Sequence, residues 1–157
     1  MKRILRVSIL VFALILVTGC ETNSGRTLTC TKKQTYNDNK FEHKYVFYYD
    51  EDDEMTKIKV DAKFTAEDKD TAKEYKEMEE EVFDDNFKGV KGISYKSKLS
   101  GKTVTISFSA DLNKLDVDDL DHDFDYYFSV DGDETRKETK EKMESKHDEY
   151  GFKCKKN

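Results

Sequence analysis

The sequence contains no proline, no low-complexity segment and no internal repeat. Linkers between domains are often rich in proline or glycine, so their absence argues for a single folded unit in a chain of 157 residues. The G-x-S-x-G elbow, a glycine-rich phosphate loop and the H-E-x-x-H zinc motif are also absent. We therefore expect a protein that is not an enzyme and that needs no cofactor.

The chain also lacks an excess of basic residues. Its formal net charge is −6, and residues 1–19 contain three basic residues and no acidic one, so the remainder stands at −9. An acidic protein is repelled by polyanions. From this average we expect no binding to nucleic acid, and none to anionic lipid headgroups through a basic patch.

No hydrophobic run is long enough to cross a membrane. The apolar stretch over residues 7–17 is interrupted only by Ser8, and a transmembrane helix needs about 18 residues or more. Basic residues precede the stretch and Val17-Thr-Gly-Cys20 closes it, which is the three-part plan of a secretory signal. Val-Thr-Gly-Cys resembles the lipobox of bacterial lipoproteins, whose cysteine is acylated and becomes the first residue.

This pattern predicts three segments. Residues 1–19 would be a lipoprotein signal peptide, Cys20 the lipidation site in a tether over residues 20–26, and residues 27–157 a globular domain. Two acyl chains are needed for stable anchoring, and a diacylated Cys20 would supply them. We expect the protein on the extracytoplasmic face of the cell membrane, held there by its lipid.

Only two further cysteines are present, Cys30 and Cys154. An exported chain with an even number of remaining cysteines usually joins them. Zinc binding is less expected, because there is no C-x-x-C pair and no histidine at ligand spacing. Leu28 and Phe152 each lie two residues from one of the cysteines, so both cysteines can point into a core. We predict a Cys30–Cys154 disulfide.

Ten phenylalanines and nine tyrosines accompany the 39% of charged residues. Disordered segments are poor in aromatic residues, so a ring-rich core is expected. Alternation with a period of two predicts a first strand around Leu28 and Cys30 and later strands over 40–50, 57–64, 93–99 and 104–110. Turns are expected at Asn37-Asp38-Asn39 and at Ser100-Gly101.

Two helices interrupt or follow these strands. Apolar residues at helical spacing predict one after Thr65, its expected cap, with the stripe Ala72, Tyr75, Met78, Val82, Phe83 and Phe87. A second helix is expected from about Glu134 to Tyr150 with Asp133 as its cap. The predicted fold is α+β: an antiparallel sheet of about five strands, one main helix packed on a face, and a C-terminal helix.

The lipobox, the run Phe87-Lys-Gly-Val-Lys-Gly-Ile-Ser-Tyr95 and the closing Tyr150-Gly-Phe-Lys-Cys154 occur together. Val104-Thr-Ile-Ser-Phe108 and Asp111 to Leu120 lie between them. Together these stretches resemble the small bacterial lipoproteins of the YehR type, a family of unknown function. The resemblance covers most of the chain after Cys20 and implies a compact α+β lipoprotein domain. It implies no active site, so no residue takes a catalytic role from it.

One segment has the density of oxygen ligands that a divalent cation requires. The candidate ligands lie within residues 116–125 and are Asp116, Asp118, Asp119, Asp121 and His122. The order of an EF-hand loop is absent, and acidic runs are usually solvated surfaces. We favour an acidic connection without metal and keep cation binding as the alternative.

Aromatic residues of the second strand allow two interpretations. Tyr45, Phe47 and Tyr49 share one face, and Val46 and Tyr48 lie opposite. An uncovered side would be a platform for a peptide or glycan. We favour core packing on both sides, one under each helix, because other large apolar residues are few.

Two histidines fall on predicted inward faces, His43 on a strand and His147 on the second helix. We expect buried imidazoles rather than general bases. The leading hypothesis is a non-enzymatic, lipid-anchored envelope protein that binds or scaffolds an unidentified envelope protein or glycan. A divalent-cation-binding envelope protein is the alternative.

Replacing Cys20 by serine tests the lipid anchor. The Cys20→Ser chain should take up no fatty-acid label in growing cells, whereas the wild-type chain is labelled, because the thiol is the acylation site that the lipobox predicts. Label that persisted on the variant would contradict the lipoprotein interpretation.

Overall fold

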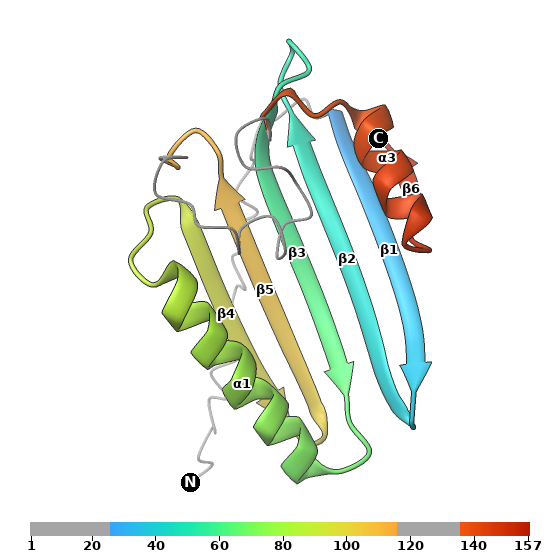
Figure 1. Ribbon diagram of the computed structural model, residues 1–157, viewed down its shortest axis with the longest axis vertical. Helices are drawn as coiled ribbons and strands as arrows, with labels where there is room; N and C mark the ends of the chain where they lie inside the picture. Colours follow the sequence, from blue (N-terminus) through green and yellow to red (C-terminus); the bar gives the residue numbers. More distant parts are fainter. Residues whose placement is uncertain (1–25, 116–135) are drawn as a thin grey trace, which may run out of the picture.

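The computed structural model describes residues 26–115 and 136–157, which form one antiparallel sheet and two helices (Figure 1). The six strands lie in the order β4-β5-β3-β2-β1-β6. This confirms the α+β class and adds a strand, β6, to the expected sheet. The elements in chain order are β1 (Arg26–Tyr36), β2 (Asn39–Tyr49), β3 (Met55–Thr65), α1 (Lys69–Phe87), β4 (Ile93–Ser100), β5 (Thr103–Asp111), α3 (Lys140–Glu149) and β6 (Lys153–Lys156).

Tight turns set the register of the hairpins. Asn37 and Asp38 connect β1 to β2 with φ angles of 46° and 64°, which suits the type I′ turns that match the twist of paired strands. Gly101 has a φ of 61° between β4 and β5. Both predicted turns are confirmed, and each fixes which residues of its two strands share a face.

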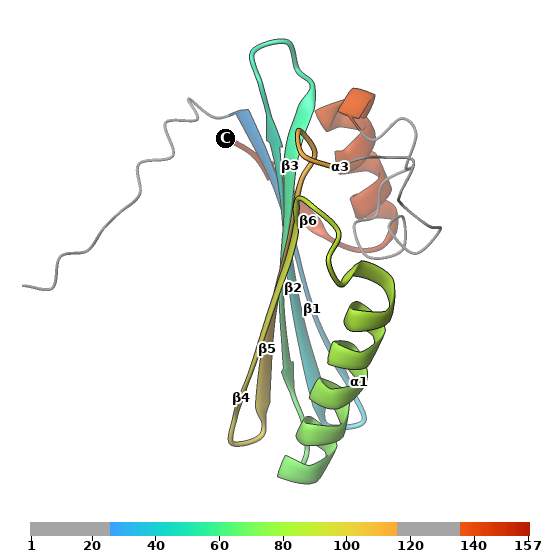
Figure 2. The same cartoon turned by 90° about the vertical axis from the view of Figure 1, so that its left-hand side faces the viewer.

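Both helices cover the same face of the sheet. Figure 2 shows α1 and α3 on one side of the strands and no described element on the other. The expectation of core packing on both sides of β2 is therefore wrong. Tyr45 and its neighbours Phe47 and Tyr49 lie under the helices, the last two at 0% and 4% exposure, so they are core residues and form no exposed aromatic platform.

The core lies between this covered face and the helices. Alternate residues of five strands point into it, as the period of two requires. Ring contacts join the layers: Phe83 of α1 stacks on Tyr95 with centroids 4.3 Å apart, and Phe64 contacts Tyr75 at 4.2 Å. The buried strand residues are Leu28, Cys30, Phe47, Tyr49, Met55, Ile58, Val60, Phe64, Val104, Ile106, Phe108 and Ala110, and Val46 is buried on the opposite face.

Helix α1 begins later than its sequence pattern indicated. The Asp68 carboxylate accepts a hydrogen bond from the Thr71 N–H at 2.8 Å and caps the helix, whereas Thr65 ends β3. The Thr71 hydroxyl also donates to Asp68, at 2.9 Å, so this carboxylate accepts two hydrogen bonds at the start of the helix. The expected apolar stripe is confirmed at Ala72, Phe83 and Phe87, and it is wrong at Met78, which is 50% exposed.

Helix α3 also begins later, at Lys140, with Thr139 as its cap instead of Asp133. The Thr139 hydroxyl accepts from the Lys142 N–H at 3.3 Å. Only two residues of this helix are buried, Met143 and His147. The stripe is as thin as the sequence indicates, so α3 needs further contacts to hold it on the sheet.

His147 supplies several of those contacts. Its ring lies 5.0 Å from Tyr45, 5.1 Å from Phe47 and 5.1 Å from Phe152 between ring centroids. Its Nδ1 lies 2.9 Å from the Met143 carbonyl and donates to it. Burial lowers the pKa of His147, so the imidazole is neutral at neutral pH. The prediction of a buried structural imidazole at this position is confirmed.

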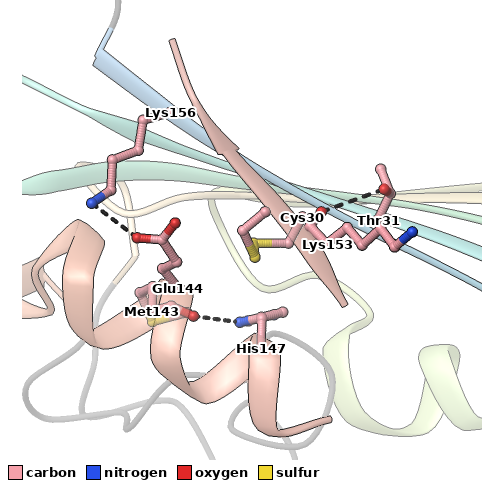
Figure 3. Close-up of a disulfide and its surroundings, with 8 residues drawn as sticks. Cys30, Thr31, Met143, Glu144, His147, Lys153 and Lys156 are labelled. Atoms are coloured by element: carbon pink, nitrogen blue, oxygen red, sulfur yellow. Dashed lines mark hydrogen bonds and ion pairs between the residues drawn. A yellow bond between two sulfur atoms is a disulfide. The ribbon is translucent and has the colours of Figure 1, made fainter. Parts of the chain in front are cut away.

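A disulfide ties the last strand to the first. Cys30 and Cys154 are direct partners of β1 and β6, with Sγ atoms 2.03 Å and Cα atoms 4.0 Å apart (Figure 3). Thr27 and Asn157 exchange both backbone hydrogen bonds. Three residues further along, the cysteines therefore occupy a position without such bonds, where opposite Cα atoms approach most closely. The sequence pattern predicted this pair.

Removing the disulfide should loosen the C-terminal part first. The bond spans 124 residues, and chain entropy sets an upper value of about 4–5 kcal/mol for loops of that size. The Cys30→Ala/Cys154→Ala variant should lose several kcal/mol in urea unfolding. Amide exchange should accelerate most in α3 and β6, because α3 buries only two side chains.

A second cross-strand pair provides the control. Ser94 and Ser109 hydroxyls lie 2.8 Å apart on paired residues of β4 and β5. The Ser94→Ala/Ser109→Ala variant should lose no more than about 1 kcal/mol. Equal losses in the two variants would contradict the role given to the disulfide.

Candidate functional site: the open face of the sheet

The side of the sheet away from the helices is a broad polar surface, called here the open face. It consists of every second residue of the six strands, fixed by the register of their pairing. Val46 and Tyr48 are its only large apolar members. The others are Thr27, Thr29, Thr31, Lys33, Thr35, Lys40, Glu42, Lys44, Lys57, Lys59, Asp61, Lys63, Thr65, Ser94, Lys96, Lys98, Ser100, Thr103, Thr105, Ser107, Ser109, Asp111, Lys153 and Lys155.

The open face is strongly basic in a protein of net charge −6. It carries ten lysines against three acidic residues. Helix α1, on the opposite side, has eight acidic residues among its nineteen. The average charge of the sequence gave no sign of this basic surface, because it conceals a separation of the two signs between the two sides of the sheet.

The lysines are spaced by hydroxyl groups. Across the strand pairs, each open-face lysine stands opposite threonine, serine, a carboxylate, Val46 or Tyr48, and never opposite another lysine. Like charges directly opposite each other destabilise a sheet. The alternation spreads the ammonium groups over the whole surface and leaves a hydroxyl donor or acceptor beside most of them.

A pocket of about 520 Å³ lies in the middle of this face. Residues from five strands line it, among them Lys33, Lys44, Lys63, Lys98, Thr105 and Ser107. It combines a positive rim with hydroxyl donors, which are the groups that bind phosphate or carboxylate oxygens.

Two carboxylates neutralise part of the rim. Glu42 pairs with Lys33 at 2.6 Å and with Lys63 at 3.1 Å, and both ammonium groups lower the pKa of Glu42. Asp61 pairs with Lys59 at 3.0 Å and accepts the Ser107 hydroxyl at 2.8 Å.

Three of the open-face lysines that line the pocket remain without such a partner. Among the described residues, no carboxylate lies within ion-pairing distance of Lys44, Lys96 or Lys98. All three side chains are exposed. An anion at the open face would meet these charges first.

A second pocket, of about 400 Å³, lies on the covered face beside α1. His43 and Glu79 contribute its titratable groups, and its other walls are mainly aromatic. Burial lowers the pKa of His43 and raises the pKa of Glu79, so both shifts favour the uncharged forms. Two ligating groups are too few to hold a metal ion, and the described part of the chain contains no group of three metal-ligating residues.

The remaining predicted sites lie outside the described residues. These are the lipidation site Cys20 and the candidate cation ligands Asp116, Asp118, Asp119, Asp121 and His122. Over residues 26–115 and 136–157, neither helix is long and apolar enough to span a membrane. The open face could not be predicted from the sequence, because its lysines come from separate strands and share a face only through the pairing of those strands.

Two solved structures share the arrangement of this chain. A protein from Streptococcus pneumoniae TIGR4, solved by NMR, aligns with a TM-score of 0.58 and 17% identity over 99% of this chain and 96% of its own. The YehR protein of Escherichia coli, also solved by NMR, aligns with a TM-score of 0.52 and 19% identity over 80% of this chain and 88% of its own. The chain has a YehR-like fold.

At fewer than one identical residue in five, these alignments show the fold alone. No protein-family model matches the chain, and no curated protein matches it either. The YehR-like fold thus supports the resemblance found in the sequence, and the chemistry of the open face has to be argued from the residues of this chain.

Charge separation predicts unusual behaviour on ion exchangers. At neutral pH and about 0.1 M salt, the protein should bind a sulfonate resin despite its negative net charge. Charges further away than about 10 Å are screened at this salt concentration, so the resin interacts with the nearer face alone. Changing Lys44, Lys96 and Lys98 to glutamine should abolish retention. The same change at Lys69, Lys73 and Lys88, on the α1 side, should leave it intact; equal behaviour of the two triple variants would contradict the open-face assignment.

Proposed function

We propose that this protein is a lipid-anchored bacterial envelope protein whose domain binds an anionic envelope component through the open face. Binding rather than catalysis is proposed because the feature that stands out is a broad charged surface. Apart from Val46 and Tyr48, the large hydrophobic residues of the sheet face the helices, so the open face contributes little to the core. Its lysine content therefore calls for an explanation other than packing.

Two observations support the extracytoplasmic anchor. Val17-Thr-Gly-Cys20 follows a short apolar run and resembles a lipobox. The Cys30–Cys154 bond is of the kind that persists in exported proteins, since cytosolic thiols are kept reduced. The two features are far apart in the sequence and agree on the same compartment.

The observation that carries the binding role is the even coverage of the open face by ammonium groups. Concentrating like charge destabilises a folded protein through self-repulsion. Here the repulsion is limited by the intervening hydroxyls but not removed, because only three carboxylates share the face. An anionic partner would relieve the remaining repulsion and gain charge-assisted hydrogen bonds.

Site-specific photo-crosslinking in cells tests this proposal. A photoreactive residue at Ser107, within the pocket of the open face, should give adducts with an envelope component on illumination. The same residue at Glu77, exposed on α1, serves as the control and should give few. Adducts from Glu77 with none from Ser107 would overturn the assignment of the binding surface.

A further inference from the structure

We propose that the open face lies against anionic lipid headgroups of the membrane that carries the anchor, so that the domain rests with its sheet towards the bilayer and its helices away from it. This deepens the proposed function, on which it rests, by naming the partner of the same surface.

Charge complementarity selects the side that meets the membrane. The open face carries ten lysines and three acidic residues, whereas α1 on the other side carries eight acidic residues and three lysines. An anionic surface attracts the first and repels the second. The attraction adds up over the lysines that lie close to such a surface, so even a few engaged lysines would fix the orientation.

The chemistry of the face suits mobile headgroups better than one shaped ligand. Its cations are all lysines, and arginine, whose planar fork recognises individual phosphates in two-point contacts, is absent from the described strands at open-face positions. Val46 is 8% exposed, so little apolar surface is available for insertion. The ammonium and hydroxyl groups of the open face suit adsorption to a layer of anionic headgroups.

The tether holds the face within reach of the headgroups. β1 begins at Arg26, six positions along the chain from the proposed anchor at Cys20, with residues 21–25 between them. An extended chain of that length spans about 20 Å at most. A domain held so closely must turn one of its sides towards the lipid, and a soluble polyanion would have to enter that narrow space. The tether therefore favours the lipid surface over a soluble polymer as the partner.

Lysine footprinting of the reconstituted mature lipoprotein tests this orientation. The protein is placed in vesicles of phosphatidylcholine alone or mixed with phosphatidylglycerol, and flotation shows whether it is anchored in both. A water-soluble acetylating reagent is then applied, and mass spectrometry follows each lysine. Lys44, Lys96 and Lys98 should react severalfold more slowly in the anionic vesicles, and Lys69, Lys73 and Lys88 should react equally in both.

Salt and a matched pair of variants sharpen the result. High salt should remove the protection, because it screens the attraction. Changing Lys44, Lys96 and Lys98 to glutamine should also remove protection at the remaining open-face Lys63 and Lys153, whereas the same change at Lys69, Lys73 and Lys88 should preserve it. Equal loss in both variants would overturn the proposal.

The other outcomes separate this inference from the proposed function. Failure to float with either vesicle would refute the lipid anchor. Flotation with equal reaction rates in both vesicles would refute the membrane orientation while the anchor stands. Protection of the open-face lysines by added polyphosphate in neutral vesicles, with none from anionic lipid, would assign the face to a soluble polyanion and overturn the inference.

Discussion

Coverage of the sheet on one side only is the constraint on which the rest of this structure depends. A strand sends successive side chains to opposite faces, and both described helices lie on the same face (Figure 2). Every apolar residue that contributes to the core must therefore fall on alternate positions, and the other positions are open to water. The disulfide between β1 and β6 belongs to this arrangement, because it holds the thinly packed α3 over the covered face.

One-sided coverage also allows the two signs of charge to separate. Residues of the open face make no contribution to the core, so they are free to be lysine, serine and threonine over the whole width of the sheet. The acidic residues gather on α1 instead. The domain therefore has a basic side and an acidic side. A nearby anionic surface would orient such a domain even though it repels the overall negative charge.

The sequence predicted the elements better than their arrangement. Alternation in β2 to β5, the Gly101 turn and the Cys30–Cys154 pair were accessible because each depends on neighbouring residues or on cysteine chemistry. β6 was missed because Lys153 to Lys156 is short and highly charged, and it is a strand only through pairing with β1. The helix caps differed by a few residues, since aspartate and threonine compete for the same backbone donors.

The side on which each helix packs could not be predicted, because it depends on long-range topology. The prediction of one helix on each side treated Val46 and Tyr48 as core residues, so it left no exposed face on the sheet. Net charge was a poor guide for the same reason: it averages over two surfaces that the fold keeps apart. The charge pattern becomes visible only when Lys44, Lys96 and Lys153, from three different strands, are known to share a face.

Whether the open face lies against the membrane can be measured by NMR relaxation enhancement from gadolinium bound to the lipid headgroups. The anchored protein would carry labelled methyl groups in bilayers that contain anionic lipid. We predict strong broadening of the methyl NMR signals of Thr31 and Thr105 on the open face. The methyl signals of Ala72 and Val82 in α1 should broaden weakly, because the sheet keeps them further from the gadolinium. Stronger broadening in α1, or equal broadening on both sides, would contradict this prediction.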